Sequence, residues 1–344
     1  MNAVNQKIID AVIEKADKTC PGSLALVGVY GSVATGDAYE KSDLDLLILI
    51  KDEEGRKLGT GFILEDKGIG YDIYCTDRAS LEYDAECHHA RLAKLMDSQI
   101  VCVKDEEAYD DLLKLRERAK RFLASGERYR RVEELIGKAK LAYANACLYG
   151  DVGQVRLEAC CAIQDLLDAV MLYHGRYFKR GVKRTFEELE ALPLDGEFAA
   201  TAKRIAACKS VFELRELMKV LILSAEAHTR RQMPKAMPSE ILAGTYEEMV
   251  SNWRNKVEEA AKHGDSFASF MNMCSLHLML REISGSVKME TFDGMEAYRT
   301  DSLAANVEAF DRCLEQYEKV YQQAGIGVKR YRDVDAFVDA YLNG

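Results

Sequence analysis

Two aspartates, Asp43 and Asp45, stand one residue apart at the start of the apolar run Leu44 to Ile50. In a strand, residues two apart point to the same side, so the two carboxylates share one face. Such a pair would repel, raise its own pKa and weaken the strand unless a cation compensates it. Magnesium accepts one or two protein carboxylates and completes its coordination with water and substrate phosphates. We therefore predict that Asp43 and Asp45 are catalytic metal ligands for Mg²⁺ or Mn²⁺.

A Gly-Ser pair, Gly31 and Ser32, follows another β-favouring run and precedes the aspartates. Gly31 has no Cβ, so the backbone can pass close to a phosphate, and the Ser32 hydroxyl and amide can donate to it. If Val33 to Gly36 open a helix, its free amides add donors at a positive dipole end. We predict that this turn holds a nucleoside triphosphate, with Gly31, Ser32 and Ser42 as nucleotide-binding residues.

A third carboxylate, Asp72, lies between Tyr71 and Ile73 in a further β-favouring run. On a strand beside the first pair it would be a catalytic residue and a metal ligand, either bridging metals or accepting the proton of the acceptor hydroxyl. With two metals ~3.5–4 Å apart, one stabilises the entering oxygen and the other the leaving pyrophosphate in an in-line displacement. The three aspartates therefore predict nucleotidyl transfer.

The elements that must position these residues are confined to the first third of the chain. Helical spacing at 4–18 is followed by β-favouring runs at 24–30, 44–50, 70–75 and 99–103. From residue 106 the strand signals end, and long segments rich in Ala, Leu, Glu, Lys and Arg have helical spacing. The predicted fold class is α+β, a small mixed-sheet head followed by a large all-helical region. We expect three domains, 1–105, 106–235 and 236–344, with Met233 to Ser239 as the break between the helical parts.

The composition narrows the class of protein. Its 47 basic and 57 acidic residues give a net charge of −10, the wrong sign for gripping a long polyanion. Ten scattered cysteines lack the spacing of a zinc site, which favours reduced thiols. The sequence shows neither the pattern of a secretory signal nor an apolar run long enough to span a bilayer. We expect a cytoplasmic protein that binds neither long nucleic acid nor a membrane.

The pair Gly31-Ser32, followed after ten residues by Asp43-Leu44-Asp45, resembles the signature of the DNA polymerase β-like nucleotidyltransferase superfamily, over roughly residues 20–105. A small head followed by helices resembles the kanamycin and lincosamide nucleotidyltransferases and their bacterial relatives. The resemblance implies magnesium, a triphosphate such as ATP, and an acceptor site between head and helices, and it leaves a homodimer open. Many relatives carry arginines shortly after the Gly-Ser pair, where this chain has Val33 and Thr35.

Two acids of the helical region are candidates for the general base. Glu158 and Asp165 are seven residues apart, and Ala162 and Ala169 lie on the same helical stripe. Either acid could take the proton of an acceptor hydroxyl at the wall of a cleft. An ordinary solvated helix face gives the same pattern, so both interpretations stay open.

A cluster of cations follows the same predicted helix, with five in nine residues. It could supply the phosphate contacts that Val33 and Thr35 lack, and we name Arg176, Lys179 and Lys183 as nucleotide-binding candidates. Cations are also favoured at the end of a helix, and these could pair with nearby glutamates. The remaining cations are Arg180 and Arg184, and the glutamates are Glu187, Glu188 and Glu190.

The leading hypothesis is an enzyme that moves a nucleoside monophosphate, AMP from ATP, to a hydroxyl of a small-molecule acceptor and releases pyrophosphate. A second hypothesis is an antitoxin-like enzyme that adenylylates a partner protein. The length of the helical region disfavours it, because that region could form its own acceptor pocket. A third is a non-catalytic nucleotide-binding module, which the retention of all three aspartates disfavours.

Overall fold

The computed structural model describes residues 2–230, 238–290 and 292–343, and the chain divides into two compact units, Met1–Arg230 and Arg231–Gly344. The predicted domain boundary near residue 105 stays a prediction. The boundary at residue 235 and most of the predicted break Met233 to Ser239 lie outside the described residues. None of the described helices has the length and apolar character needed to cross a membrane.

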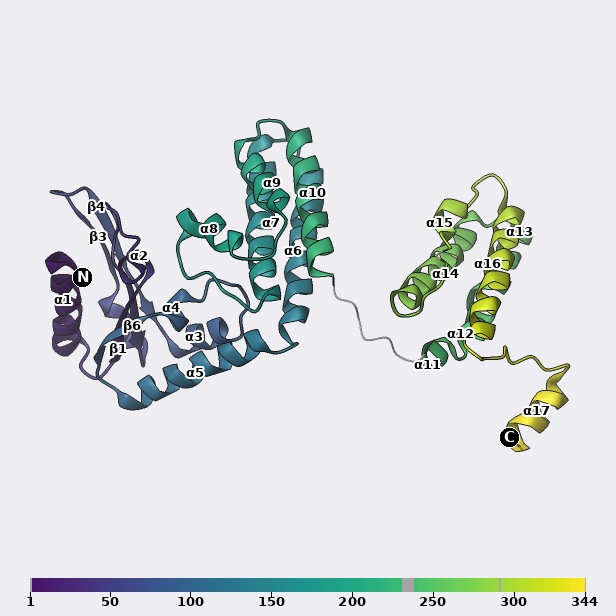
Figure 1. Cartoon of the computed structure of the whole chain (residues 1–344), viewed down its shortest axis with the longest axis horizontal. Coiled ribbons are helices and arrows are strands. Elements are labelled where there is room, and N and C mark those ends of the chain that lie inside the picture. Colours follow the sequence, from purple (N-terminus) through teal and green to yellow (C-terminus); the bar gives the residue numbers. More distant parts are fainter. Residues whose placement is uncertain (1, 231–237, 291, 344) are drawn as a thin grey trace. The chain divides into compact units, whose positions relative to one another are not determined.

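The head of the first unit is built on a four-stranded mixed sheet in the order β5-β2-β1-β6 (Figure 1). Strand β1 (Leu24–Tyr30) is antiparallel to β2 (Asp45–Ile50) and to β6 (Gln99–Val103), whereas β5 (Cys75–Thr76) runs parallel to β2. Helices follow for the rest of the chain, so the predicted fold class, a mixed-sheet head before a large helical region, is confirmed.

The two central strands are buried on both faces. Alternate residues of β2 enter different cores: Leu47 and Leu49 pack toward the helical side, while Leu46 and Ile48 pack toward helix α1 (Ala3–Thr19). This alternation follows from the period of two in a strand. A strand covered on both faces reads as a continuous apolar run, which is why β1 and β2 were legible in the sequence.

A separate hairpin of β3 (Thr60–Leu64) and β4 (Ile69–Ile73) carries Asp72. The sequence prediction included β4 but omitted β3, whose segment contains Gly61 and follows Gly59, and glycine weakens strand propensity. The turn residue Gly68, with a φ of 60°, supplies the left-handed conformation that a tight hairpin needs. A turn signal around Gly68 could therefore have revealed the missing strand.

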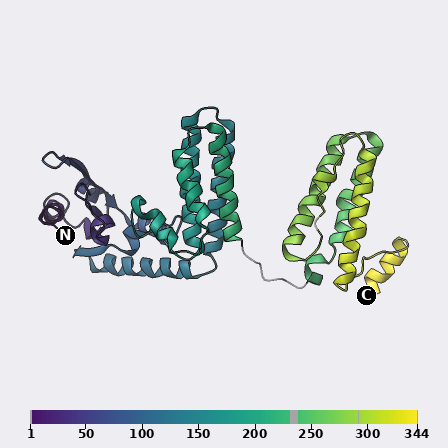
Figure 2. The same ribbon diagram turned by 45° about the horizontal axis from the view of Figure 1, so that its top comes forward.

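The helical body of the first unit is connected to the head by α5 (Glu106–Ala124). Its longest helices, α6 (Arg128–Leu148), α7 (Val152–Tyr173) and α10 (Val211–Thr229), lie side by side (Figure 2). One apolar core runs from the helical face of the sheet into this bundle. The shorter elements of the unit are η1 (Glu53–Leu58), α3 (Arg78–Ala85), α4 (Ala93–Met96), η2 (Val182–Arg184), α8 (Thr185–Glu190) and α9 (Gly196–Ala207).

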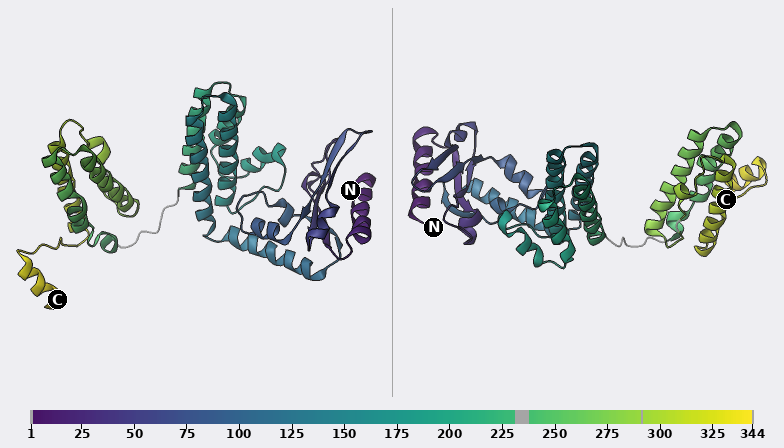
Figure 3. Two further views of the ribbon diagram at one scale, coloured as in Figure 1. Left: turned by 180° about the vertical axis from the view of Figure 1, so that it is seen from behind. Right: turned by 90° about the horizontal axis from the view of Figure 1, so that it is seen from above.

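The second unit is a helical bundle with a separate core, rich in tyrosine and methionine (Figure 3). Its C-terminal helix α17 (Val334–Asn343) has no buried residue, and its apolar side chains recur at helical spacing on an exposed face. The other elements are α11 (Pro238–Leu242), α12 (Thr245–Met249), the π-helical turn η3 (Val250–Arg254), α13 (Asn255–His263), α14 (Ser266–Ser286), α15 (Gly294–Ala297) and α16 (Leu303–Gln323).

Two histidines meet where α7 ends and α10 approaches its C-terminus. The Nε2 atoms of His174 and His228 are 2.8 Å apart, although 54 residues separate them in the sequence. Burial lowers the pKa of both side chains, and for His174 the neighbouring His228, Arg176 and Arg128 lower the pKa further. The pair is therefore favoured in its neutral form, in which one ring donates and the other accepts.

This pair predicts a pH dependence of stability. Because the folded pKa of each histidine is depressed, its contribution is present above the unfolded value of about 6.5 and is lost as the pH falls below it. Thermal unfolding of the first unit, followed by circular dichroism, should therefore show a lower midpoint at pH 5.5 than at pH 7.5. His228→Gln should reduce this difference, whereas His263→Gln, which changes an exposed histidine of α13, should not. Equal pH dependence in His228→Gln and the wild type would contradict the assignment.

Candidate active site

The pairing of β1 with β2 brings the predicted site together. Tyr30, the last residue of β1, is opposite Asp45, the first residue of β2, because the two strands are antiparallel neighbours. Gly31 and Ser32 continue directly from Tyr30, and Asp43 precedes Asp45 by two residues. The Gly-Ser pair and the aspartate pair, ten residues apart in the sequence, thus lie at one edge of the sheet.

Gly31 lies directly against the Asp45 carboxylate. Its φ is 67°, in the left-handed region that favours glycine, and a Cβ built on it would be 1.9 Å from Oδ2 of Asp45. The backbone N–H of Ser32 donates a hydrogen bond to the same carboxylate. The glycine is therefore required both by its conformation and by the closeness of the Asp45 carboxylate.

The electrostatics of Asp45 are those of an uncompensated acid. Burial raises its pKa most, the charge of Asp43 raises it further, and the Ser32 N–H acts in the opposite direction. Residues 43–45 place two carboxylates side by side, while Leu44 between them is buried in the core. A divalent cation would relieve both the burial of Asp45 and the repulsion between the acids, so the pair fits a magnesium ion.

The turn after β1 is a short helix, α2 (Gly31–Thr35), that begins two residues earlier than the predicted Val33. It ends at Gly36, which has a φ of 76° and whose N–H donates to the Ser32 carbonyl. The Ser32 amide, predicted to bind phosphate, already has the Asp45 carboxylate as its acceptor. The turn therefore positions a metal-ligand candidate in addition to any phosphate that it binds.

Asp72 lies on the exposed face of β4. Together with Asp43 it lines an open hollow on the β3–β4 hairpin, next to the Phe62 and Tyr71 rings. Throughout residues 2–230, 238–290 and 292–343, no three His, Cys, Asp or Glu side chains converge closely enough to hold a metal ion. The structure thus brings Asp72 near Asp43 without completing a three-ligand cluster, and its metal-binding role stays a prediction.

Two tyrosines at the site were not anticipated from the sequence. The hydroxyls of Tyr30 and Tyr74 are 2.9 Å apart. Burial raises the pKa of Tyr30 far above its usual value, and Tyr74, Asp45 and Asp84 add to this. Tyr30 therefore stays protonated beside the carboxylates. The available signals were the position of Tyr30 before Gly31 and the spacing of two between Asp72 and Tyr74, which is typical of one strand face.

The cation cluster of the helical body is divided among several places, and two of its arginines, Arg180 and Arg184, contact the loop after α2. Arg180 donates two hydrogen bonds to the Asp37 carboxylate through Nε and Nη2, and the Arg184 Nε is 3.3 Å from Oδ1. These contacts lower the pKa of Asp37 to about 2, with the Arg180 hydrogen bonds as the largest cause. Glu187 pairs with both arginines. Cations thus reach the loop that directly follows α2, the helix that contains Val33 and Thr35.

The other predicted nucleotide-binding residues have separate surroundings. Ser42 closes the turn before Asp43, because its hydroxyl accepts a hydrogen bond of 2.9 Å from the Tyr39 amide. The Lys183 ammonium is 5.7 Å from the centre of the Tyr39 ring. Arg176 and Lys179 line a different hollow with Tyr177 and Glu188. Of these cations, Lys183 lies closest to the segment that leads into the aspartate pair.

The candidate general bases lie on α7. Glu158 accepts a hydrogen bond of 3.5 Å from Asn145, and burial raises the pKa of Asp165. One turn further, Asp168 is 4% exposed, and its Oδ1 has no hydrogen-bond partner among the described residues. Arg91, from the segment after α3, approaches the other Asp168 oxygen at 3.8 Å. Asp168, which sequence reasoning missed, is therefore a buried acid that approaches Arg91 of the head, whereas Glu158 and Asp165 are half-buried.

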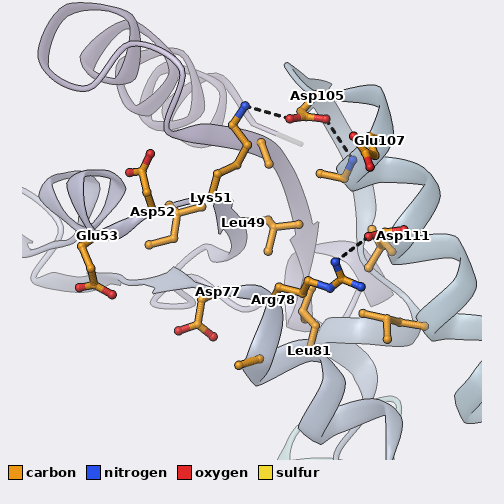
Figure 4. Close-up of a pocket in the computed structure, with 16 residues that line it drawn as sticks. Leu49, Lys51, Asp52, Glu53, Asp77, Arg78, Leu81, Asp105, Glu107 and Asp111 are labelled. Atoms are coloured by element: carbon orange, nitrogen blue, oxygen red, sulfur yellow. Dashed lines mark hydrogen bonds and ion pairs between the residues drawn. The ribbon is translucent and has the colours of Figure 1, made fainter.

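Another hollow, of about 440 Å³, lies at the other end of β2 (Figure 4). Many acids line it, but three of them, Asp52, Asp77 and Asp105, accept hydrogen bonds from the first turns of η1, α3 and α5. Two cations are also paired there, Lys51 with Asp105 and Arg78 with Asp111. Helix capping accounts for much of this acidity, and none of the three predicted metal ligands lines the hollow.

Comparison with known proteins identifies the class of the head. Residues 6–123 match the family model of the nucleotidyltransferase domain. A solved structure described as a nucleotidyltransferase-like protein from Exiguobacterium sibiricum is similar over 73% of this chain and 81% of that one, at 12% identity and a TM-score of 0.36. The search of curated proteins found no match. Residues 6–123 therefore form a nucleotidyltransferase domain, the polymerase β-like class of domain that performs nucleotidyl transfer.

The contact between Gly31 and Asp45 yields a prediction with a matched control. Gly31→Ala should cost about 1–2 kcal/mol of backbone free energy and should also displace the Asp45 carboxylate, so nucleotidyl transfer should be lost. Gly36→Ala imposes a similar backbone cost, but nothing lies within 4 Å of its added Cβ. Unfolding midpoints and pyrophosphate release should therefore separate the two variants. Equal activities at equal stability would show that the Gly31 contact does not matter.

Proposed function

We propose that the chain is a metal-dependent nucleotidyltransferase that moves AMP from ATP to a hydroxyl of a small-molecule acceptor and releases pyrophosphate. The observation that carries the proposal is the joint placement of Gly31, Ser32 and Asp45, in which the turn after β1 binds the first residue of β2. Asp43 and Asp45 are two half-buried carboxylates at the start of β2, and their mutual repulsion favours a bound cation. A nucleotidyltransferase requires this combination of a phosphate turn and two metal-binding carboxylates.

In this proposal Asp43 and Asp45 hold magnesium or manganese, which arrives with the triphosphate. Bound metal would stabilise charge on the entering oxygen and on the leaving pyrophosphate. The protein's own part is to keep the two carboxylates ionised and oriented, and the Ser32 N–H serves Asp45 in this way. Asp72 is proposed to complete the site from the hairpin, as a ligand or as the base for the acceptor hydroxyl.

For the triphosphate we propose the α2 turn with Gly31, Ser32 and Ser42, helped by cations of the helical body. Arg180 and Arg184 support this role, because they contact Asp37 directly after the helix in which relatives carry arginines. Lys183, beside Tyr39, is a further candidate. We give Arg176 and Lys179 a smaller part, since they line a hollow that contains none of the catalytic aspartates.

The acceptor is proposed to bind against the helical body, with Asp165 or Glu158 as alternative bases to Asp72. The raised pKa of Asp165 supports it, because a base works best when its pKa approaches the working pH. The charge of −10 argues against long nucleic acid as acceptor. The likeness to kanamycin and lincosamide enzymes makes antibiotics of those classes the first acceptors to try.

The decisive test measures pyrophosphate release from magnesium and each nucleoside triphosphate, with and without a panel of small-molecule acceptors. Asp43→Asn and Asp45→Asn should each lower acceptor-dependent release by roughly 100-fold or more, because each removes a charge that holds the metal. Asp72→Asn should lower it as well. Asp10→Asn, an exposed change on α1, is the matched control and should keep full activity.

Each outcome has a meaning for the proposal. Full activity in Asp43→Asn or Asp45→Asn, with the fold intact by circular dichroism, would refute the metal site. Triphosphate binding without release for any small acceptor would instead favour a protein acceptor or a non-catalytic module. Those two alternatives separate when labelled ATP is incubated with cell extract, because only the first labels a protein.

A further inference from the structure

The contact between Asp37 and Arg180 joins two parts of the first unit that are 143 residues apart in the sequence. Arg180 belongs to the segment between α7 and α8, whereas Asp37 follows the short helix α2 directly. The two donors of one guanidinium reach both oxygens of one carboxylate, an arrangement that fixes orientation as well as distance. The helical body therefore holds one defined point of the head's catalytic loop.

Asp37 is itself hydrogen-bonded to the turn that precedes it. Its backbone N–H donates to the Ser32 carbonyl at 2.9 Å, and its side chain accepts a hydrogen bond of 3.2 Å from the Thr35 hydroxyl. The Gly36 N–H donates to the same Ser32 carbonyl, which gives the end of α2 two bonds to one acceptor. Any displacement of Asp37 would therefore be transmitted to Ser32.

Ser32 completes the connection to the catalytic acid. Its carbonyl accepts from Asp37, while its N–H is directed at the Asp45 carboxylate and lowers the pKa of that group. Hydrogen bonds thus run from the Arg180 guanidinium through Asp37 to Ser32, and the α2 turn in turn lies against the Asp45 carboxylate at Gly31. Residues 38–41, which lead from Asp37 toward Asp43, are exposed and are not part of this connection.

We propose that Asp37 and Arg180 are positioning residues for nucleotidyl transfer, which hold the α2 turn from the helical body and so fix the Asp45 carboxylate. This inference rests on the proposed function and extends it, because it makes the helical body a part of the catalytic geometry. The Asp37 side chain is only 13% exposed, which is less than the acidic side chain of most other ion pairs in the described residues. Glu187 keeps Arg180 and Arg184 together at the same point.

The test uses the full chain with paired variants. Asp37→Asn keeps the shape of the side chain and removes its charge, and Arg180→Gln removes the other partner. Asp37→Glu is the conservative variant, which retains an acceptor for the guanidinium. Lys104→Gln breaks an ion pair of the same head, with Asp17 at 3.0 Å, that has no contact with the loop, and is the control.

The first measurement is hydrogen–deuterium exchange, which requires no catalytic activity. In Asp37→Asn and Arg180→Gln, amides in peptides covering residues 31–37 should exchange roughly tenfold faster, while those of β1 and β6 should be unchanged. Asp37→Glu and Lys104→Gln should resemble the wild type. Faster exchange across the whole head would instead indicate a merely structural ion pair, and unchanged exchange in residues 31–37 would overturn the proposal.

The second measurement separates kcat from KM. A displaced carboxylate should lower kcat by roughly 10- to 100-fold and leave the acceptor KM nearly unchanged, because small misplacements act on the reacting geometry. The double variant should be no worse than either single one, since both remove the same contact. A normal kcat in Asp37→Asn, alongside loss of transfer in Asp43→Asn, would refute the positioning role and leave the proposed function intact. If the variants exchange faster only in residues 31–37 but the wild type shows no nucleotidyl transfer, the connection from Arg180 to the α2 turn would stand and the proposed function would be refuted.

Discussion

The repulsion between Asp43 and Asp45 is the constraint around which the head is organised. Two carboxylates are placed side by side at the entrance of a buried strand, where burial and mutual charge both oppose their ionisation. The strand tolerates them because Leu44 and the residues after Asp45 are fully packed, and because a backbone amide is directed at one acid. The same arrangement that is unfavourable for folding favours a compensating cation, which in the proposed function arrives with the triphosphate.

Much of this site could be predicted from the sequence, because it depends on local rules. Strand periodicity predicts that Asp43 and Asp45 share one side, and the Gly-Ser turn follows the β-favouring run that pairs with β2 in the structure. The contact of Asp37 with Arg180 could not be predicted in the same way, since it joins residues that only tertiary packing brings together. The hydroxyl contact between Tyr30 and Tyr74 has the same origin. Strand β3 escaped prediction because Gly61 weakens its propensity and Gly59 directly precedes it, although the turn at Gly68 was a usable signal.

The helical body illustrates a different limit of sequence reasoning. The spacing of Glu158 and Asp165 in the sequence is the same whether water or another part of the protein covers their helix face, so the spacing cannot distinguish the two. The structure distinguishes neighbours on that face: the pKa of Asp165 is raised by burial, and the adjacent Asp168 is nearly inaccessible. Similarly, five cations in nine residues formed one cluster in the sequence, but they divide between the Asp37 loop, the Tyr39 ring and a separate hollow.

The apolar core that runs from the sheet into the bundle bears on whether the head could exist without the helical body. Leu47 and Leu49 of the central strand share that core with helices of the body, such as Leu166 and Val170 of α7. A head cut away at residue 105 would expose this face to water and would lose much of its hydrophobic stabilisation. The head and the helical body of the first unit are therefore expected to fold together, and any replacement of the body would have to supply apolar side chains that cover Leu47 and Leu49 again.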